Sequence, residues 1–244
     1  MKKYFFYFVL FLSTLVSCKK ENDSSRFISI DSAYPLAVGK TFWYRLDSTV
    51  PVDFGKSLEV HSYLAKDSIE SSYIDPTGKT AFRIYRYITD TLKSKPWQFC
   101  ATHTATLTAN SIEYTENNLR FIKLVNPISY NTSWKGNSYI NTTQGVSPYY
   151  YFDDWNYHYE NIEKPFTCIK QTFDTTYTVL QNDEQSPSSF DPTTYNDRRY
   201  GKEVYAKGVG LIYKELLFYI WQITPKPAFQ DDSYGIKLNL IDYK

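Results

Sequence analysis

Cysteine, histidine and glycine are scarce in this chain, and their scarcity limits the chemistry that it can perform. The 244 residues include 3 Cys, 3 His and 9 Gly. The three histidines, His61, His103 and His158, lie in separate segments. The sequence contains no nucleophile elbow, no His-Glu-x-x-His pair and no glycine-rich phosphate loop. We therefore expect no catalytic residue, no cofactor and no metal site, and we favour a function without catalysis.

The chain also lacks an excess of basic charge. Lys and Arg number 27, against 26 Asp and Glu, and no basic block stands out. Affinity for nucleic acid comes largely from Lys and Arg that neutralise phosphates. The composition therefore predicts no nucleic-acid partner.

Only one long hydrophobic run occurs, and it lies at the N-terminus. Lys2 and Lys3 precede a largely apolar run at residues 4–16, which Ser17 follows. As a helix this run would rise about 20 Å, less than the roughly 30 Å of a bilayer's hydrocarbon core. A basic start, a short apolar run and a small residue are typical of a secretion signal. We predict that residues 1–17 are a signal peptide that is cleaved.

The end of this segment, Leu15-Val16-Ser17-Cys18, resembles the lipobox of bacterial lipoproteins. The resemblance implies cleavage just before Cys18 and diacylation of that residue. Two acyl chains anchor a protein stably, whereas one does so only marginally. The alternative is an ordinary secretion signal that happens to contain a cysteine.

Residues 18–33 are predicted to be the lipidated cysteine and a flexible tether, because Lys, Glu, Asn, Asp and Ser are frequent there. Residue 19 is Lys rather than Asp, which by resemblance to enterobacterial sorting rules favours the outer membrane. Residues 19–23 also resemble the export tags of surface lipoproteins in Bacteroidota. Both a periplasm-facing and a surface-exposed position stay open.

Beyond residue 40 the sequence alternates apolar and polar residues with a period of two. Such alternation is typical of half-buried strands, and the 24 Tyr and 16 Phe favour strands as well. Residues 34–244 are therefore predicted to form one mainly β, antiparallel domain: a large curved sheet, a half-barrel or a sandwich. The predicted strands cover residues 41–48, 57–65, 82–88, 97–103, 119–125, 166–180, 202–207 and 236–241.

Three further segments are less regular. Residues 215–222 allow a helix or a strand, and we favour the strand because alternate residues share an apolar face. The polar residues 182–199 are predicted to be an exposed loop. Gly208 and Gly210 join two apolar runs and indicate a hairpin turn or a bulge.

The most aromatic stretch lies at residues 149–159, where seven of eleven residues carry an aromatic ring. Exposed aromatic rings bind apolar ligand groups and sugar faces. The alternating rings near its end also have strand spacing, so packing in the core is the alternative. If the stretch is a ligand surface, its residues are Tyr149, Tyr151, Trp155, Tyr157 and Tyr159.

Cys100 and Cys168 remain if Cys18 is acylated. The cell envelope is oxidising, so a Cys100–Cys168 disulfide is one prediction. It would close a loop of about 70 residues and stabilise the fold by about 4 kcal/mol in the chain-entropy model. Two buried free thiols are the alternative. Cys100 and His103 have a metal-like spacing, but two ligands do not make a zinc site.

Asp153 and Asp154, followed by His158, are the acidic cluster that a hydrolase or a metal site could use. Acidic doublets are more often solvated turns. Glycoside hydrolysis needs two carboxylates at a defined separation, which a sequence does not supply. These residues are kept as an alternative, and the prediction stays that no metal is bound.

Four blocks resemble a group of uncharacterised outer-membrane lipoproteins of Bacteroidota. They are YPLAVGKTFWYRLDS at 34–48, TVLQND at 178–183, EVYAKGVGLIYKE at 203–215 and LIDYK at 240–244. The group has no assigned activity, so the resemblance implies only a location in the cell envelope and a fold. Envelope proteins of that phylum also carry O-glycans at Asp-Ser or Asp-Thr followed by an apolar residue or Thr. Ser32 is the best candidate here, because it lies near the predicted tether.

These features together predict a membrane-anchored envelope lipoprotein that acts as a binding or accessory component without catalytic activity. Its expected partners are the membrane, through the lipid, and a glycan or an outer-membrane protein. The alternative is a hydrolase acting on glycans or envelope polymers, with Asp153 and Asp154 in its site.

Replacement of the acylated residue tests the anchor. Cys18→Ala should move the protein from the membrane to the soluble fraction, because the acyl chains supply the attachment. Ultracentrifugation measures this, and mass spectrometry should find acyl groups on an N-terminal Cys18 in the wild type. Ser17→Ala keeps a small residue before the cysteine and should stay on the membrane. A Cys18→Ala protein that sediments with membranes would contradict the prediction.

Overall fold

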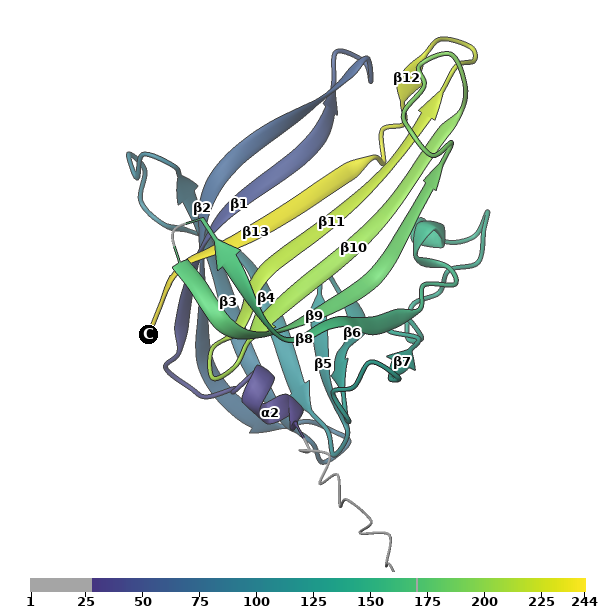
Figure 1. Cartoon of the computed structure of the whole chain (residues 1–244). Helices are drawn as coiled ribbons and strands as arrows, with labels where there is room; N and C mark the ends of the chain where they lie inside the picture. The colour runs from purple at the N-terminus through teal and green to yellow at the C-terminus, as the bar shows by residue number, and fades with distance from the viewer. Residues whose placement is uncertain (1–27, 170) are drawn as a thin grey trace, which may run out of the picture.

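The computed structural model describes residues 28–169 and 171–244, which are mostly β-strand (Figure 1). One short helix, α2 (Ile30–Ala33), and one 3-10 helical turn, η1 (Tyr150–Phe152), are also present. The predicted mainly β domain is confirmed. Within these ranges no helix is long and apolar enough to cross a membrane. The strands are β1 (Thr41–Val52), β2 (Ser57–Ile74), β3 (Thr80–Asp90), β4 (Gln98–Leu107), β5 (Ser111–Glu116), β6 (Leu119–Val125), β7 (Ser133–Trp134), β8 (Tyr157–Cys168), β9 (Gln171–Ser186), β10 (Asn196–Ala206), β11 (Gly210–Gln222), β12 (Ala228–Phe229) and β13 (Tyr234–Tyr243).

The strands form one antiparallel sheet in the order β6-β5-β4-β3-β2-β1-β13-β11-β10-β9-β8-β7, with β12 beside β11. Strands β1 to β6 are consecutive neighbours on one side, and β7 to β11 are consecutive neighbours on the other. This order follows the general tendency of successive strands to pair with each other. The last long strand, β13, lies between β1 and β11 and so joins the two halves.

The two edges of the sheet meet, so that it curls into a nearly closed half-barrel. Ile122 N in β6 donates to Gly136 O at 2.8 Å, and the Trp134 indole N–H donates to Ile122 O at 2.8 Å. The Tyr159 hydroxyl donates to Val125 O at 2.7 Å and accepts the Val125 N–H at 3.1 Å. These bonds satisfy backbone groups that an open edge would leave unpaired. Of the predicted architectures, the structure therefore has the half-barrel.

The most aromatic stretch of the chain packs inside this half-barrel. Trp155, Tyr157 and Tyr159 are 1%, 0% and 1% exposed. Two glycines make room for the rings: a Cβ at Gly136 would lie 2.3 Å from Tyr157, and one at Gly201 would lie 2.7 Å from Trp155. The structure thus has the core packing that the sequence left as an alternative, and the three rings do not form the predicted ligand surface.

Helix α2 closes one end of the half-barrel, at the bottom of Figure 1. The Ser29 side chain caps the helix, and Ile30 and Ala33 are buried. Residues 28–33 therefore belong to the folded domain and not to the tether, because their apolar side chains extend the core. The predicted signal peptide, Cys18 and the remaining tether, at residues 1–27, lie outside the described residues.

The segment predicted as a loop at residues 182–199 is mostly strand. Strand β9 continues to Ser186 and β10 begins at Asn196, so residues 187–195 alone connect them. The prediction was wrong because the side chains at this end of the β9–β10 hairpin are polar and exposed, which resembles a loop. The backbones of the two strands are nevertheless paired there. The strand predicted at 215–222 is confirmed in β11, and Gly208, with φ 79°, forms the predicted hairpin turn.

Removal of one hydroxyl group tests the closure of the sheet. Tyr159→Phe should lower the free energy of unfolding by about 1–3 kcal/mol, because the Val125 N–H and C=O lose their partner. Urea denaturation followed by tryptophan fluorescence gives this value. Tyr87→Phe, on the outer face of β3, should change it by less than about 0.5 kcal/mol. Equal effects of the two variants would show that the bond to Val125 does not hold the edges together.

Candidate functional site

The half-barrel is left unfilled at the end opposite α2. A cleft of about 200 Å³ opens there beside the first residues of β4 and β13 and the turn between β5 and β6. The walls of the cleft are mainly apolar, and its base is polar. The apolar lining includes Leu46, Leu119, Phe121, Phe152, Leu216 and Ile236, and the base consists of Arg86, His103, Glu116 and Lys214.

Strand alternation turns charged side chains toward this interior. In β3, the rings of Tyr85 and Tyr87 pack on Phe99 at the outer face, so Arg86 between them points inward. In β11, Lys214 is 8% exposed. Buried charges of this kind require partners, because ions lose most of their solvation inside a protein.

Two strong ion pairs lie at the base of the cleft. Arg86 Nε and Nη2 donate to the two carboxylate oxygens of Asp67 at 2.7 and 2.6 Å. Lys214 Nζ donates to both oxygens of Glu116 at 2.6 and 2.7 Å. Burial alone would raise the pKa of Glu116, but the nearby lysines outweigh it and hold that pKa well below its ordinary value. In both pairs the carboxylate accepts two charge-assisted hydrogen bonds from its cation, so its buried charge is compensated.

The network continues toward α2. Lys123 Nζ donates to Glu203 Oε1 at 2.7 Å and to Glu116 Oε1 at 3.3 Å. The Tyr205 hydroxyl donates to Glu203 Oε2 at 2.7 Å. A cavity of about 20 Å³ lies among these side chains, which is room for about one water molecule. Three cations thus face three carboxylates in the interior, and their formal charges cancel.

His103 takes no part in this network. It is 3% exposed and its ring lies 5.6 Å from that of Tyr114, yet neither Nδ1 nor Nε2 has a hydrogen-bond partner. Burial, followed by the positive charge of Arg86, lowers the pKa of His103 to about 4. The ring is therefore neutral at pH 7 and offers one unused donor and one unused acceptor. The sequence identified His103 only as an isolated histidine and as half of a metal-like pair with Cys100.

The two cysteines occupy different surroundings. Cys100 is exposed at the rim of the cleft, whereas Cys168 is buried and its Sγ donates to Ile212 O at 3.1 Å. Burial raises the pKa of Cys168 to about 11. The predicted disulfide does not form: both thiols are free, with Cys100 exposed in β4 and Cys168 buried in β8. The alternative of two buried thiols holds for Cys168 but not for Cys100.

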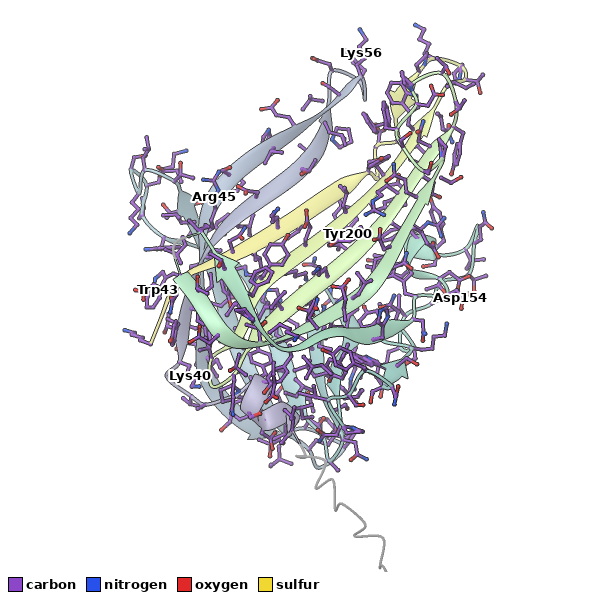
Figure 2. The ribbon with its side chains drawn as sticks, in the orientation of Figure 1. Lys40, Trp43, Arg45, Lys56, Asp154 and Tyr200 are labelled. Carbon is purple, nitrogen blue, oxygen red and sulfur yellow. The ribbon has the colours of Figure 1, made fainter. Side chains whose placement is uncertain are left out.

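The acidic cluster predicted as an alternative site is dispersed at the surface. Asp154 projects at the right of Figure 2 and pairs with Lys135 at 2.6 Å. Asp153 instead accepts a bond from the Thr142 hydroxyl at 2.7 Å. Among the residues that the structure describes, no three His, Cys, Asp or Glu side chains are placed to hold a metal ion.

The remaining predicted site residues lie apart from the cleft base. Tyr149 is half-buried, and Tyr151 is 5% exposed and stacks on Phe218 at 4.2 Å. Ser32 lies in α2, where its hydroxyl donates to Ser29 O at 2.7 Å. Glycosylation of Ser32 stays a prediction.

Comparison with known proteins gives little guidance. No protein-family model matches the chain, and no curated protein matches it. A protein of Bacteroides fragilis NCTC 9343, predicted to be exported and described with a YmcC-like fold, aligns over 86% of this chain and 98% of its own, with 7% identity and a TM-score of 0.39. A predicted lipoprotein of Parabacteroides distasonis ATCC 8503 aligns over 87% and 98%, with 12% identity and a TM-score of 0.40. Similarity this low carries no argument about fold or function.

The lowered pKa of His103 predicts a particular acid sensitivity. The folded-state pKa of about 4 lies below the ordinary value of 6.5, so the unfolded chain binds more protons between these pH values. The stability of the wild type should therefore fall as the pH drops from about 6.5 to about 4. His103→Leu should remove this loss, which is about 1.4 kcal/mol for each tenfold difference in proton affinity between the folded and unfolded chain.

Urea denaturation at pH 7 and pH 4.5 measures the effect. At pH 7 the His103→Leu variant should be at least as stable as the wild type, because two unpaired buried atoms are removed. His61→Leu alters a half-buried histidine of β2 outside the cleft and should keep the wild-type pH dependence. If His103→Leu keeps it as well, the acid sensitivity has another origin.

Proposed function

We propose that this chain is a lipid-anchored lipoprotein of the bacterial outer membrane that binds a small amphiphilic molecule inside its half-barrel. The anchor is supported by the signal-like residues 1–17 and by Cys18, and the outer-membrane address by Lys19. Binding is supported by one observation above all: the unpartnered His103 at the base of an apolar cleft.

The lining of the cleft indicates the chemistry of the ligand. Apolar side chains such as Phe121 and Leu216 form its walls, which suits a hydrocarbon or ring body. At the base, Arg86 and Lys214 are already paired with carboxylates, so no formal charge is left for an ionic head group. His103 can give one hydrogen bond and accept another. A neutral hydroxyl or amide head group therefore fits best.

The unpaired state of His103 is itself costly. A buried polar group without a partner destabilises a fold by about 1–3 kcal/mol. Local violations of this kind are expected at functional sites, where the ligand compensates for them. A ligand hydroxyl at the base of the cleft would satisfy the ring nitrogen that faces it and would lower that cost.

Three probes that share an eight-carbon chain and differ in their head group test this proposal. We expect n-octanol to raise the melting temperature of the purified mature protein more than octanoate or octylamine do, because its head group is neutral. Octanol should also slow the reaction of Cys100 with a maleimide, since that thiol lies at the rim of the cleft. The buried Cys168 is the internal reference and should stay unreactive in the folded protein.

Two variants separate specific binding from a general solvent effect. His103→Leu should abolish the octanol shift and the protection of Cys100 while the domain stays folded. His158→Leu, on a histidine outside the cleft, should behave as the wild type does. The proposal fails if none of the three probes shifts the melting temperature, or if the octanol effect persists in His103→Leu.

A further inference from the structure

A second group of aromatic side chains lies on the outer wall of the half-barrel. Trp43 in β1 alternates with Phe42 and Tyr44, which are buried, so its indole faces outward at the left of Figure 2. In register it lies beside Lys66 of β2 and Asp242 of β13. This indole is therefore placed on the outer surface among charged neighbours.

The connection between β3 and β4 makes this part of the wall concave. A groove of about 450 Å³ runs along the outer surface, and Trp97 from that connection lines it together with Trp43. Both indoles are half-buried. The other residues that line the groove are Tyr44, Leu64, Lys93, Ile241 and Asp242.

The connection that carries Trp97 is held in place by hydrogen bonds. The Asp90 carboxylate accepts the N–H groups of Leu92, Ser94 and Lys95 at 3.0, 3.1 and 2.8 Å. These bonds, led by that of Ser94, lower the pKa of Asp90 to about 2. The Thr89 hydroxyl also donates to Lys95 O at 2.7 Å. The groove is thus formed before any ligand binds, which reduces the entropic cost of binding.

The two indoles are not used for packing against other rings. Core rings of this protein stack on one another, but within residues 28–169 and 171–244 neither Trp43 nor Trp97 forms a ring pair. Instead Lys244 Nζ lies 5.7 Å from the Trp43 ring centroid and Lys66 Nζ lies 5.5 Å from that of Trp97. Cation–π contacts at exposed sites contribute only about 0.5–1 kcal/mol, so packing does not account for two indoles here.

We propose that this groove binds a saccharide. The flat, apolar faces of two indoles suit the C–H faces of sugar rings, and such rings combine an apolar body with a polar edge. The Asp242 carboxylate can accept hydrogen bonds from sugar hydroxyls, and the Lys93 ammonium can donate to them. A lipid surface would instead contact projecting side chains such as Leu92, which is 86% exposed, before it reached the recessed indoles. The site is separate from the interior cleft and does not depend on the function proposed for it.

Titration with defined oligosaccharides tests the proposal. The probes are maltohexaose, cellohexaose, xylohexaose and chitohexaose, added to the purified mature protein while tryptophan emission is recorded. At least one should change the emission with a saturable dependence on concentration. Trp43→Ala and Trp97→Ala should each raise the Kd by at least about tenfold, whereas Trp97→Tyr, which keeps a flat ring, should raise it by less than about threefold.

Controls separate this groove from the cleft and from a membrane-binding surface. Phe54→Ala, at an exposed tip of the sheet, and His103→Leu, in the cleft, should both bind the saccharide as the wild type does. Circular dichroism should show that both tryptophan variants remain folded. The proposal is overturned if no hexasaccharide changes the emission, or if binding survives in both alanine variants. It is also overturned if the Cys18→Ala protein binds phosphatidylglycerol vesicles through Trp43 and Trp97 instead.

Discussion

A curled sheet must satisfy the backbone groups of its two edges. In this protein β6, at one edge, is paired by Trp134 of β7, by Gly136 just after it and by Tyr159 of β8. Strand β7 has only two residues and cannot supply a full ladder. Trp134 and Tyr159 therefore bond directly to the backbone of β6. A closed seam encloses the interior, and the aromatic residues around it become core for that reason. The burial of Trp155 and Tyr157, and the need for glycine beside them, follow from the same closure.

The enclosed interior is only partly apolar. Beside the aromatic core it holds paired charges from strands far apart in sequence, and Glu116 and Lys214, 98 residues apart, form one of the pairs. Exchange of such pairs for apolar residues is often neutral or stabilising, so they are weak evidence for stability. Here they keep the base of the cleft polar while leaving no net charge. His103 lies among them without a hydrogen-bond partner, so the base of the cleft is not a fully satisfied polar core.

The strands were predictable because alternation is a local property, and β1, β3 and β6 are found where the sequence places them. Alternation separates the two faces of a strand, but it does not say which charged residue on the inner face finds a partner. Arg86 shares its face with Ile84, and its partner Asp67 comes from another strand. The aromatic stretch was ambiguous because burial of Trp155 depends on edges that meet only in the folded sheet. The outer groove was not foreseen, since Trp43 and Trp97 are brought together by a connection that folds over the wall.

The position of α2 has a consequence for how a ligand arrives. The described chain begins at residue 28 and enters the half-barrel at its closed end, opposite the mouth of the cleft. A lipid on Cys18, as proposed, would be joined to the molecule on the side of α2, while the mouth of the cleft lies at the other end. A ligand of the cleft would then enter at the end of the molecule that lies away from the tether. The anchor would keep the protein at the membrane surface. A neighbouring membrane protein would then contact the side of the half-barrel before it reached the mouth of the cleft.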